Sequence, residues 1–191
     1  MADDADGIAR TYVACWRDAY RDILPDKVLA AMSVERERAS WRRVVAQGLA
    51  RHRVLVLIGG QGVAGFLTYG ADRAAGGPER SAGGEIFTLY VLPRQQGQGA
   101  GRRLMAGAAE AMRAEGYRGA ILWVLARNRP ARGFYEDLGG SPAGERATTV
   151  AGTRLSLAGY RWAELEALEE AAAKLSEIRL PAPLDRVTPG A

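Results

Sequence analysis

The spacing of hydrophobic positions predicts helices in the amino-terminal third of the chain. Apolar residues recur there every three or four positions, which is the period of an amphipathic helix. This pattern covers about residues 6–20 and 33–47, and a shorter helix is expected over 25–32. The predicted fold therefore begins with helices.

Short apolar runs bounded by glycine follow and predict buried strands. Gly59-Gly60-Gln61-Gly62 suits a hairpin turn between the first two runs, and residues 71–84 are rich enough in Gly, Ala and Arg to predict a loop. The predicted strands are residues 54–58, 63–69, 85–92 and 120–125.

The rest of the chain alternates helical and strand patterns and ends in a proline-rich tail at 180–191. This order predicts a mixed α/β (α+β) domain with one central, mostly antiparallel mixed sheet flanked by helices. We expect this domain to span residues 1–162, and 163–191 to form a helical extension with an irregular tail. The remaining predicted elements are helices at about 99–115, 130–138 and 163–178 and strands at 144–150 and 153–162.

Composition and charge narrow the class of protein. The chain has 191 residues, 48% of them hydrophobic and 25% charged, which is typical of one globular domain. Only Lys27 and Lys174 are lysines, so 24 of the 26 basic residues are arginines. The net charge of +4 is too small to establish nucleic-acid binding. With no secretory signal and no apolar stretch of about 18 residues, we expect a soluble, cytoplasmic protein without a membrane partner.

Cys15 and His52 are the one cysteine and the one histidine, and they limit the possible chemistry. No disulfide can form within the chain, and a structural zinc site needs about four such ligands. A histidine-dependent hydrolase would have to use His52, which lies between two arginines and is expected at the surface. Cys15 lies in a helical pattern and is expected to be a small buried apolar residue. We therefore predict no metal site and no hydrolase that depends on His52.

A glycine-rich turn, Gln96-Gly97-Gln98-Gly99-Ala100-Gly101, lies between a predicted strand and a predicted helix. The free N–H groups and the dipole of a helix start bind anions, phosphates above all. Arg94, Arg102 and Arg103 add positive charge. Such turns also close strand–helix junctions for steric reasons, so the turn alone leaves both roles open. A Walker A loop is excluded because no Gly-Lys-Ser/Thr occurs, and the third glycine has the wrong spacing for a dinucleotide-binding turn.

This turn resembles the Q/R-x-x-G-x-G/A signature of the GNAT superfamily of acyl-CoA-dependent N-acetyltransferases. About thirty residues later, residues 128–139 are similar to that family's second motif, N-x-x-A-x-x-F-Y-x-x-x-G. Residues 89–93 resemble the family's fourth strand, and residues 16–25 and 160–162 resemble parts of one bacterial branch. The resemblance covers about residues 5–162 and implies a GNAT-like domain.

The resemblance implies acetyl-CoA as the co-substrate. Its pyrophosphate would lie on the N–H groups of residues 97–101, and its pantetheine arm would pair with the strand that contains Val91. The cofactor-binding residues implied in this way are Leu89, Val91, Gln96, Gly97, Gln98, Gly99, Ala100, Gly101, Arg102, Asn128 and Tyr135.

The resemblance also implies direct attack of an amine on the thioester, with two catalytic residues. Tyr135 matches the family's general-acid tyrosine, and the alternative is a core aromatic beside Phe134. Glu85 is our candidate general base, because a partly buried carboxylate has a raised pKa that suits proton removal from an ammonium group. The alternative for Glu85 is an ordinary charge at a strand start.

The acceptor site is expected to use Trp16, Tyr20 and Tyr90. Trp41, Tyr69 and Trp123 are further aromatic candidates, and a core role is the alternative for each of the six. The predicted function is acetylation of a small-molecule amine, with a homodimer as a candidate assembly. Acetylation of a protein lysine or N-terminus, and a non-catalytic acyl-CoA-binding regulator, stay open as alternatives; a nucleic-acid partner is not expected.

One departure from the family concerns the edge of the sheet. Members usually begin with an edge strand before the first helix, and Met1 falls about where that strand should have ended. Residues 178–182 faintly resemble the missing strand. We hypothesise that the tail fills this edge in the same or a partner chain; the alternative is a surface helix followed by a disordered tail.

Overall fold

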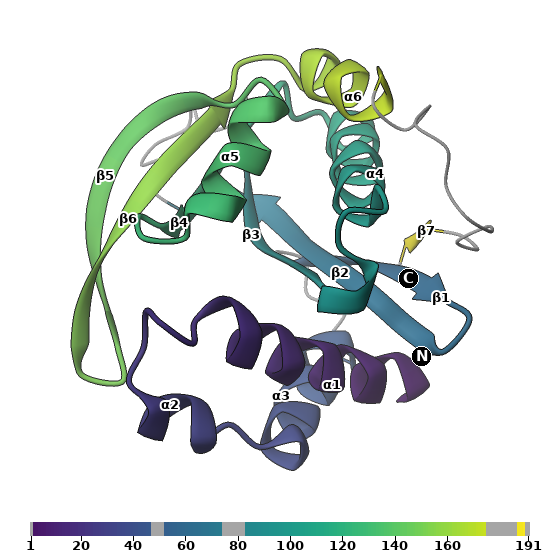
Figure 1. The fold of residues 1–191 in the computed structure, drawn as a ribbon. Helices are drawn as coiled ribbons and strands as arrows, with labels where there is room; N and C mark the ends of the chain where they lie inside the picture. The colour runs from purple at the N-terminus through teal and green to yellow at the C-terminus, as the bar shows by residue number, and fades with distance from the viewer. Residues whose placement is uncertain (1, 47–51, 74–82, 175–186, 190–191) are drawn as a thin grey trace.

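The fold is given by a computed structural model that describes residues 2–46, 52–73, 83–174 and 187–189. Within these residues, one seven-stranded mixed sheet has the order β5-β6-β4-β3-β2-β1-β7, with helices on both faces (Figure 1). The strands are β1 (Arg53–Gly59), β2 (Gly62–Ala71), β3 (Gly83–Val91), β4 (Gly119–Leu125), β5 (Ser141–Val150), β6 (Thr153–Trp162) and β7 (Val187–Pro189).

The helices lie in two layers. Helices α1 to α3 cover one face, and α4, α5 and α6 cover the other (Figure 1). Their bounds are α1 (Ala2–Ala19), α2 (Asp26–Ala30), α3 (Val34–Ala46), α4 (Ala100–Ala114), α5 (Arg129–Asp137) and α6 (Leu165–Lys174), with a 3-10 turn at Pro93–Gln95. The predicted fold class is confirmed. None of the helices in the described part of the chain combines the length and the apolar character that a membrane span requires.

The main core lies between the sheet and α4. The residues of α4 that face the sheet are fully buried, among them Leu104, Met105 and Met112. Burial of each such side chain contributes about 1.5–3 kcal/mol. Leu165 and Leu168 of α6 join the same core, so the helix of the predicted extension packs into the domain.

A smaller core lies under α1 on the opposite face, around Ile8, Val56 and Phe66. Gly7 lets α1 lie close to β2, because a Cβ at that position would be only 2.3 Å from Cγ2 of Val63. Thr11 of the same helix donates a hydrogen bond of 3.0 Å to the carbonyl oxygen of Val63. These two contacts set the distance between α1 and the sheet.

The two central strands separate before they end. β3 pairs in parallel with β4 only from Gly83↔Gly119 to Ile86↔Leu122, although β3 continues to Val91. Phe87 is an extra residue on β3, because Ile86 and Thr88 pair with consecutive residues of β2. Beyond this bulge, the facing edges of β3 and β4 are not paired with each other.

The carboxy-terminal tail supplies the outer edge strand. β7 pairs antiparallel with β1 through Leu55↔Pro189, Val56↔Thr188 and Leu57↔Val187. The hypothesis that the tail fills this edge is confirmed for the same chain. Residues 178–182, which suggested it, lie outside the described residues, and the expectation of a wholly irregular tail is wrong for 187–189.

Deletion of residues 187–191 should lower the free energy of unfolding by about 1–3 kcal/mol, since a backbone hydrogen bond contributes about 0.5–1.5 kcal/mol. Urea denaturation of the shortened chain measures this change. Deletion of residues 190–191 alone, which keeps β7, is the control. Equal stability of the two truncated chains would show that β7 contributes nothing to the fold.

Candidate active site

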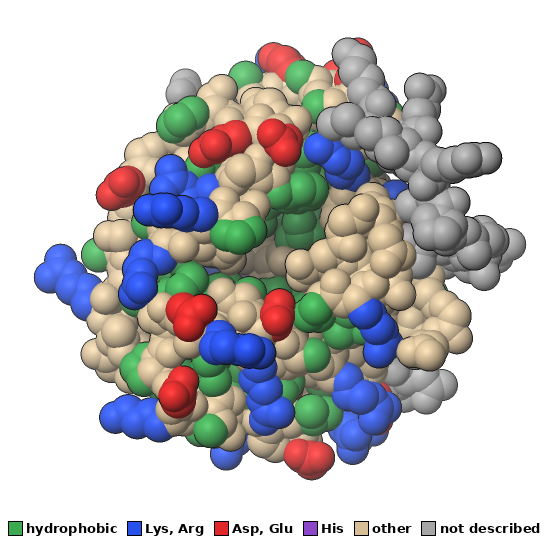
Figure 2. All heavy atoms as spheres, in the orientation of Figure 1, with side chains coloured by type: hydrophobic (Ala, Val, Ile, Leu, Met, Phe, Trp, Pro, Cys, Tyr) green, Lys and Arg blue, Asp and Glu red, His purple; other side chains and the backbone are tan. Residues whose placement is uncertain are grey.

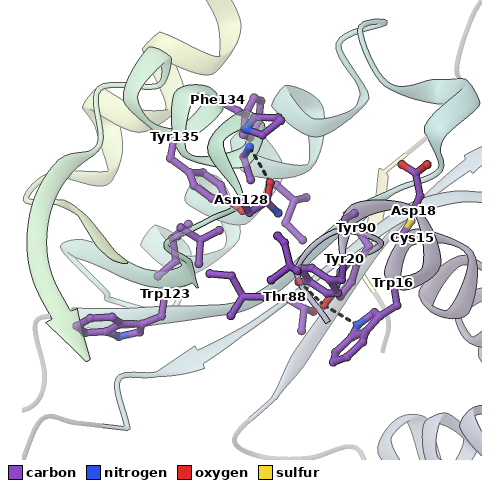
Figure 3. Close-up of a pocket in the computed structure, with 18 of the residues that line it drawn as sticks. Cys15, Trp16, Asp18, Tyr20, Thr88, Tyr90, Trp123, Asn128, Phe134 and Tyr135 are labelled. Carbon is purple, nitrogen blue, oxygen red and sulfur yellow. Dashed lines mark hydrogen bonds between the residues drawn. The ribbon is translucent and has the colours of Figure 1, made fainter. Parts of the chain in front are cut away.

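The separation of β3 and β4 opens a cavity of about 780 Å³. The molecule is hollowed near the centre of the face in Figure 2, and apolar side chains line the hollow. α1, the Gly97 turn, α5 and the β5–β6 hairpin complete the walls (Figure 3). The cavity therefore lies where sequence-distant elements meet at the ends of the central strands.

Ten of the predicted site residues line this cavity. Glu85, Gln98, Gly99, Ala100 and Arg102 do not line it. The residues that do are Trp16, Tyr20, Leu89, Tyr90, Val91, Gln96, Gly97, Gly101, Asn128 and Tyr135.

The glycine turn has the geometry of an anion-binding helix start. Gly97 and Gly99 have φ values of 71° and 78°, which only glycine adopts at little cost. Gly99 is the N-cap of α4, and no side chain caps the helix there. The first N–H groups of α4 therefore receive no acceptor from the side chain of the N-cap residue.

Two glutamines hold this turn in place. Nε2 of Gln96 donates to the carbonyl oxygen of Val91 at 3.0 Å, and Nε2 of Gln98 donates to that of Arg94 at 2.8 Å. Gln98 thus shapes the turn from outside the cavity. Arg102 instead connects helices, because its Nη1 donates to the carbonyl oxygen of Ala171 in α6 at 3.3 Å.

α5 brings Asn128 and Tyr135 to the opposite wall. Asn128 caps the helix, and its Oδ1 accepts a hydrogen bond of 3.3 Å from the N–H of Ala131. Tyr135 is 7% exposed and packs against Phe134 and Tyr160, with ring centroids 5.4 and 5.9 Å away. Burial raises the pKa of the Tyr135 hydroxyl, so it keeps its proton at neutral pH and can act as a donor.

The three residues predicted to bind the acceptor form one hydrogen-bonded cluster. Nε1 of Trp16 donates to the hydroxyl of Tyr90 at 2.8 Å, and the hydroxyls of Tyr20 and Tyr90 are 3.4 Å apart (Figure 3). Burial raises the pKa of both tyrosines, so they stay neutral. The cluster presents a rigid aromatic wall to the cavity.

The other aromatic candidates divide between core and cavity. Trp41 packs against Phe66, with ring centroids 5.1 Å apart, and Tyr69 is buried with its hydroxyl donating to Glu115. Trp123 lines the cavity.

Cys15 also lines the cavity. It is buried as expected, and burial raises the pKa of its thiol to about 12. A thiol with that pKa is a poor nucleophile at neutral pH.

Glu85 lies beside the cavity rather than in it. Its carboxylate oxygens accept hydrogen bonds of 2.9 Å from Nε and 2.6 Å from Nη2 of Arg73. Burial alone would raise the pKa of the carboxyl, but the hydrogen bonds and charge of Arg73 outweigh it and hold the pKa below its usual value. The expectation of a raised pKa is wrong, and this placement argues against Glu85 as a general base.

Two carboxylates that sequence reasoning missed do line the cavity. Asp18 and Asp22 lie at the end of α1 and in the turn that follows it, next to Tyr20. Among the described lining residues they are the acidic ones. Glu35, near the start of α3, does not line the cavity and accepts a hydrogen bond from Ser33. In the sequence, an aspartate at the end of a helix cannot be distinguished from an ordinary surface charge. Asp18 and Asp22 were therefore recognised only from their positions in the structure.

Comparisons with known proteins agree with this geometry. The sequence model described as "Acetyltransferase (GNAT) family" matches residues 10–139. The chain is 30% identical over 168 residues to the uncharacterized N-acetyltransferase YuaI of Bacillus subtilis, covering 87% of this chain and 92% of that protein.

Solved structures show the same fold at low identity. The PaiA N-acetyltransferase of Thermoplasma acidophilum, solved with coenzyme A, superposes with a TM-score of 0.60 at 16% identity over 84% of this chain and 94% of that one. YncA of Salmonella typhimurium, solved with acetyl-CoA, gives a TM-score of 0.63 at 20% identity over 86% and 90%.

Gly97→Ala should weaken coenzyme A binding at least about tenfold, or about 1.4 kcal/mol. The reason is that a Cβ disfavours the positive φ with which the turn presents its N–H groups. Isothermal titration calorimetry measures the Kd. Gly116→Ala is the matched control, since Gly116 has a φ of 89° and equally open surroundings at the other end of α4. Both variants should lose about 1–2 kcal/mol of stability. Equal Kd values for the two variants would show that the turn does not hold the ligand.

Proposed function

The chain belongs to the GNAT family of acetyltransferases, acyltransferases that use acetyl-CoA as co-substrate, and on this premise we propose that it acetylates a primary amine of a small molecule. The observation that carries the proposal is the cavity, which has a glycine turn at one end and two carboxylates beside an aromatic wall. A volume of about 780 Å³ lies in the usual range for small-molecule sites, about 300–1,000 Å³.

The residues around the cavity fit acetyl-CoA. The N–H groups of residues 97–101 would hold its phosphates at the start of α4. Past the bulge, the edge of β3 at Leu89 and Val91 faces the cavity rather than β4, so its backbone groups, apart from the Val91 carbonyl oxygen that accepts from Gln96, are available to an extended ligand. Asn128 would contribute from the opposite wall. When bound, acetyl-CoA supplies a thioester as the acetyl donor.

Tyr135 is the proposed catalytic residue. Its hydroxyl lies on the α5 wall of the cavity and keeps its proton because burial raises its pKa. It can therefore give a proton to the departing thiolate while it takes one from the nitrogen of the tetrahedral intermediate, so that no free phenolate, a stronger base than the thiolate, has to form.

The α1 side of the cavity suits a cationic amine with an apolar body. Asp18 and Asp22 attract the ammonium form of the acceptor by charge. Trp16, Tyr20 and Tyr90 offer ring surfaces to its apolar part, and aromatic faces also attract cations. The acceptor loses its proton to water at the open end of the cavity, so Glu85 has no part in the step.

An assay of coenzyme A release against a panel of amines tests the function. We expect turnover with small amines that carry an aromatic or aliphatic group, and little with lysine-containing or amino-terminal peptides. Turnover only with peptides would instead identify a protein acetyltransferase. Coenzyme A binding without turnover on any amine would favour a non-catalytic regulator.

Tyr135→Phe should lower kcat about 10²- to 10⁴-fold, the usual contribution of a general acid, and leave the Kd for coenzyme A within about twofold. Tyr69→Phe is the matched control, because it removes a buried hydroxyl that donates to Glu115 away from the cavity. Steady-state kinetics and calorimetry separate the two effects. An unchanged kcat in Tyr135→Phe would exclude the proposed donor.

The dependence of kcat/KM on pH should follow the deprotonation of the acceptor amine. Because the neutral fraction of an amine with a pKa near 10 rises about tenfold per pH unit, kcat/KM should rise from pH 7 to pH 9. No fall should follow up to pH 10, since Tyr135 has a raised pKa and is still protonated there. A bell-shaped profile with a maximum below pH 9 would contradict this assignment.

A further inference from the structure

Glu85 is the centre of a charged cluster that the proposed reaction does not use. The residue is 1% exposed and occupies one of the last paired positions between β3 and β4, opposite Ile121. Arg73 contacts its carboxylate through Nε, Nη2 and the backbone N–H. Nη2 of Arg146, from β5, lies 3.9 Å from Oε1. One buried carboxylate thus holds two guanidinium groups, one from the bend after β2 and one from β5.

Each of these guanidinium groups also lies over an aromatic ring. The guanidinium carbon of Arg73 is 4.4 Å from the ring centroid of Phe87, and that of Arg146 is 4.2 Å from the ring centroid of Trp123. Both distances are typical of cation–π contacts. Phe87 and Trp123 both line the cavity.

The two rings lie where the strands part. The last parallel pair is Ile86↔Leu122, so Phe87 and Trp123 are the next residue on each strand. Phe87 is also the bulge residue of β3. Both strands continue beyond this point, to Val91 and Leu125, without further pairing between them. The cation–aromatic pairs therefore stand at the base of the separation.

A buried charge makes this arrangement difficult to rearrange. A carboxylate that is nearly inaccessible to water is costly unless it remains paired, so Arg73 and Arg146 cannot leave it without a penalty. Because the same guanidinium groups cover Phe87 and Trp123, the positions of the rings are coupled to the ion pairs.

We propose that Glu85, Arg73 and Arg146 form a positioning cluster that fixes where β3 and β4 separate and thereby sets the shape of the cavity for acetyl-CoA. The inference rests on the proposed use of this cavity. It assigns Glu85 a role through its neighbours, in place of a role in proton transfer.

Glu85→Gln tests the cluster, because it keeps the size of the side chain and removes its charge. We expect the Kd for coenzyme A and the KM for acetyl-CoA each to rise at least about tenfold, with kcat changed less than about threefold. A general base predicts the opposite split, a large fall in kcat with an unchanged KM. An unchanged Kd and KM in the folded variant would overturn the proposal.

Glu115→Gln is the matched control. Glu115 accepts a hydrogen bond of 2.9 Å from Nε of Arg53 and lies just after α4, away from the cavity, so its variant should keep the wild-type Kd. A similar rise in Kd for both variants would show that Glu85→Gln acts through general destabilisation, and this would overturn the proposal.

Arg146→Lys keeps the test decisive if Glu85→Gln does not fold. Lysine keeps the positive charge near Glu85 but loses the planar contact with Trp123. We expect a rise in the Kd of about threefold or more, and a wild-type Kd would contradict the cluster. Because calorimetry needs no turnover, coenzyme A binding tests the cluster even if no acceptor amine is found and the proposed function fails.

Discussion

The site depends on one constraint in the sheet: β3 and β4 stop pairing after Ile86 and Leu122 although both strands continue. Backbone N–H and C=O groups need partners, and along these facing edges the neighbouring strand does not supply them. The space between the strands therefore presents hydrogen-bonding groups that belong to the main chain. This explains how a chain with one histidine and one cysteine can offer a polar binding site.

Several of the abundant arginines act as connectors between elements. Nη2 of Arg17 donates to the carbonyl oxygen of Met32, Nη2 of Arg127 to that of Asp22, and Nη1 of Arg132 to that of Ala126. Each acceptor lies outside a helix or strand, where backbone carbonyls lack regular partners. A guanidinium group can satisfy such an oxygen and still bind elsewhere, as Nε of Arg132 does with the hydroxyl of Tyr160. The excess noticed in the composition thus has a structural use besides any attraction of phosphates.

Local patterns predicted the parts of the site that are local in the chain. The turn at residues 97–101 follows from a strand–turn–helix order that can be read within a few residues, whereas Asn128 was identified through the resemblance and its role as a helix cap came from the structure. The environment of Glu85 could not be predicted, because Arg73 follows β2 and Arg146 lies in β5, and these strands are on opposite sides of β3 in the sheet order. Asp18 was missed because nothing in its own helix marks it as facing a cavity.

β7 makes the order of synthesis relevant to this fold. Its partners, residues 55–57, are synthesised about 130 residues before residues 187–189. Contacts this distant in sequence form late, because the intervening chain must first be ordered. The outer edge of β1 is therefore uncovered on every nascent chain, and an uncovered strand edge can pair with another chain. Chaperone dependence and aggregation during expression should thus respond to changes in β1 more than the stability of the finished protein suggests.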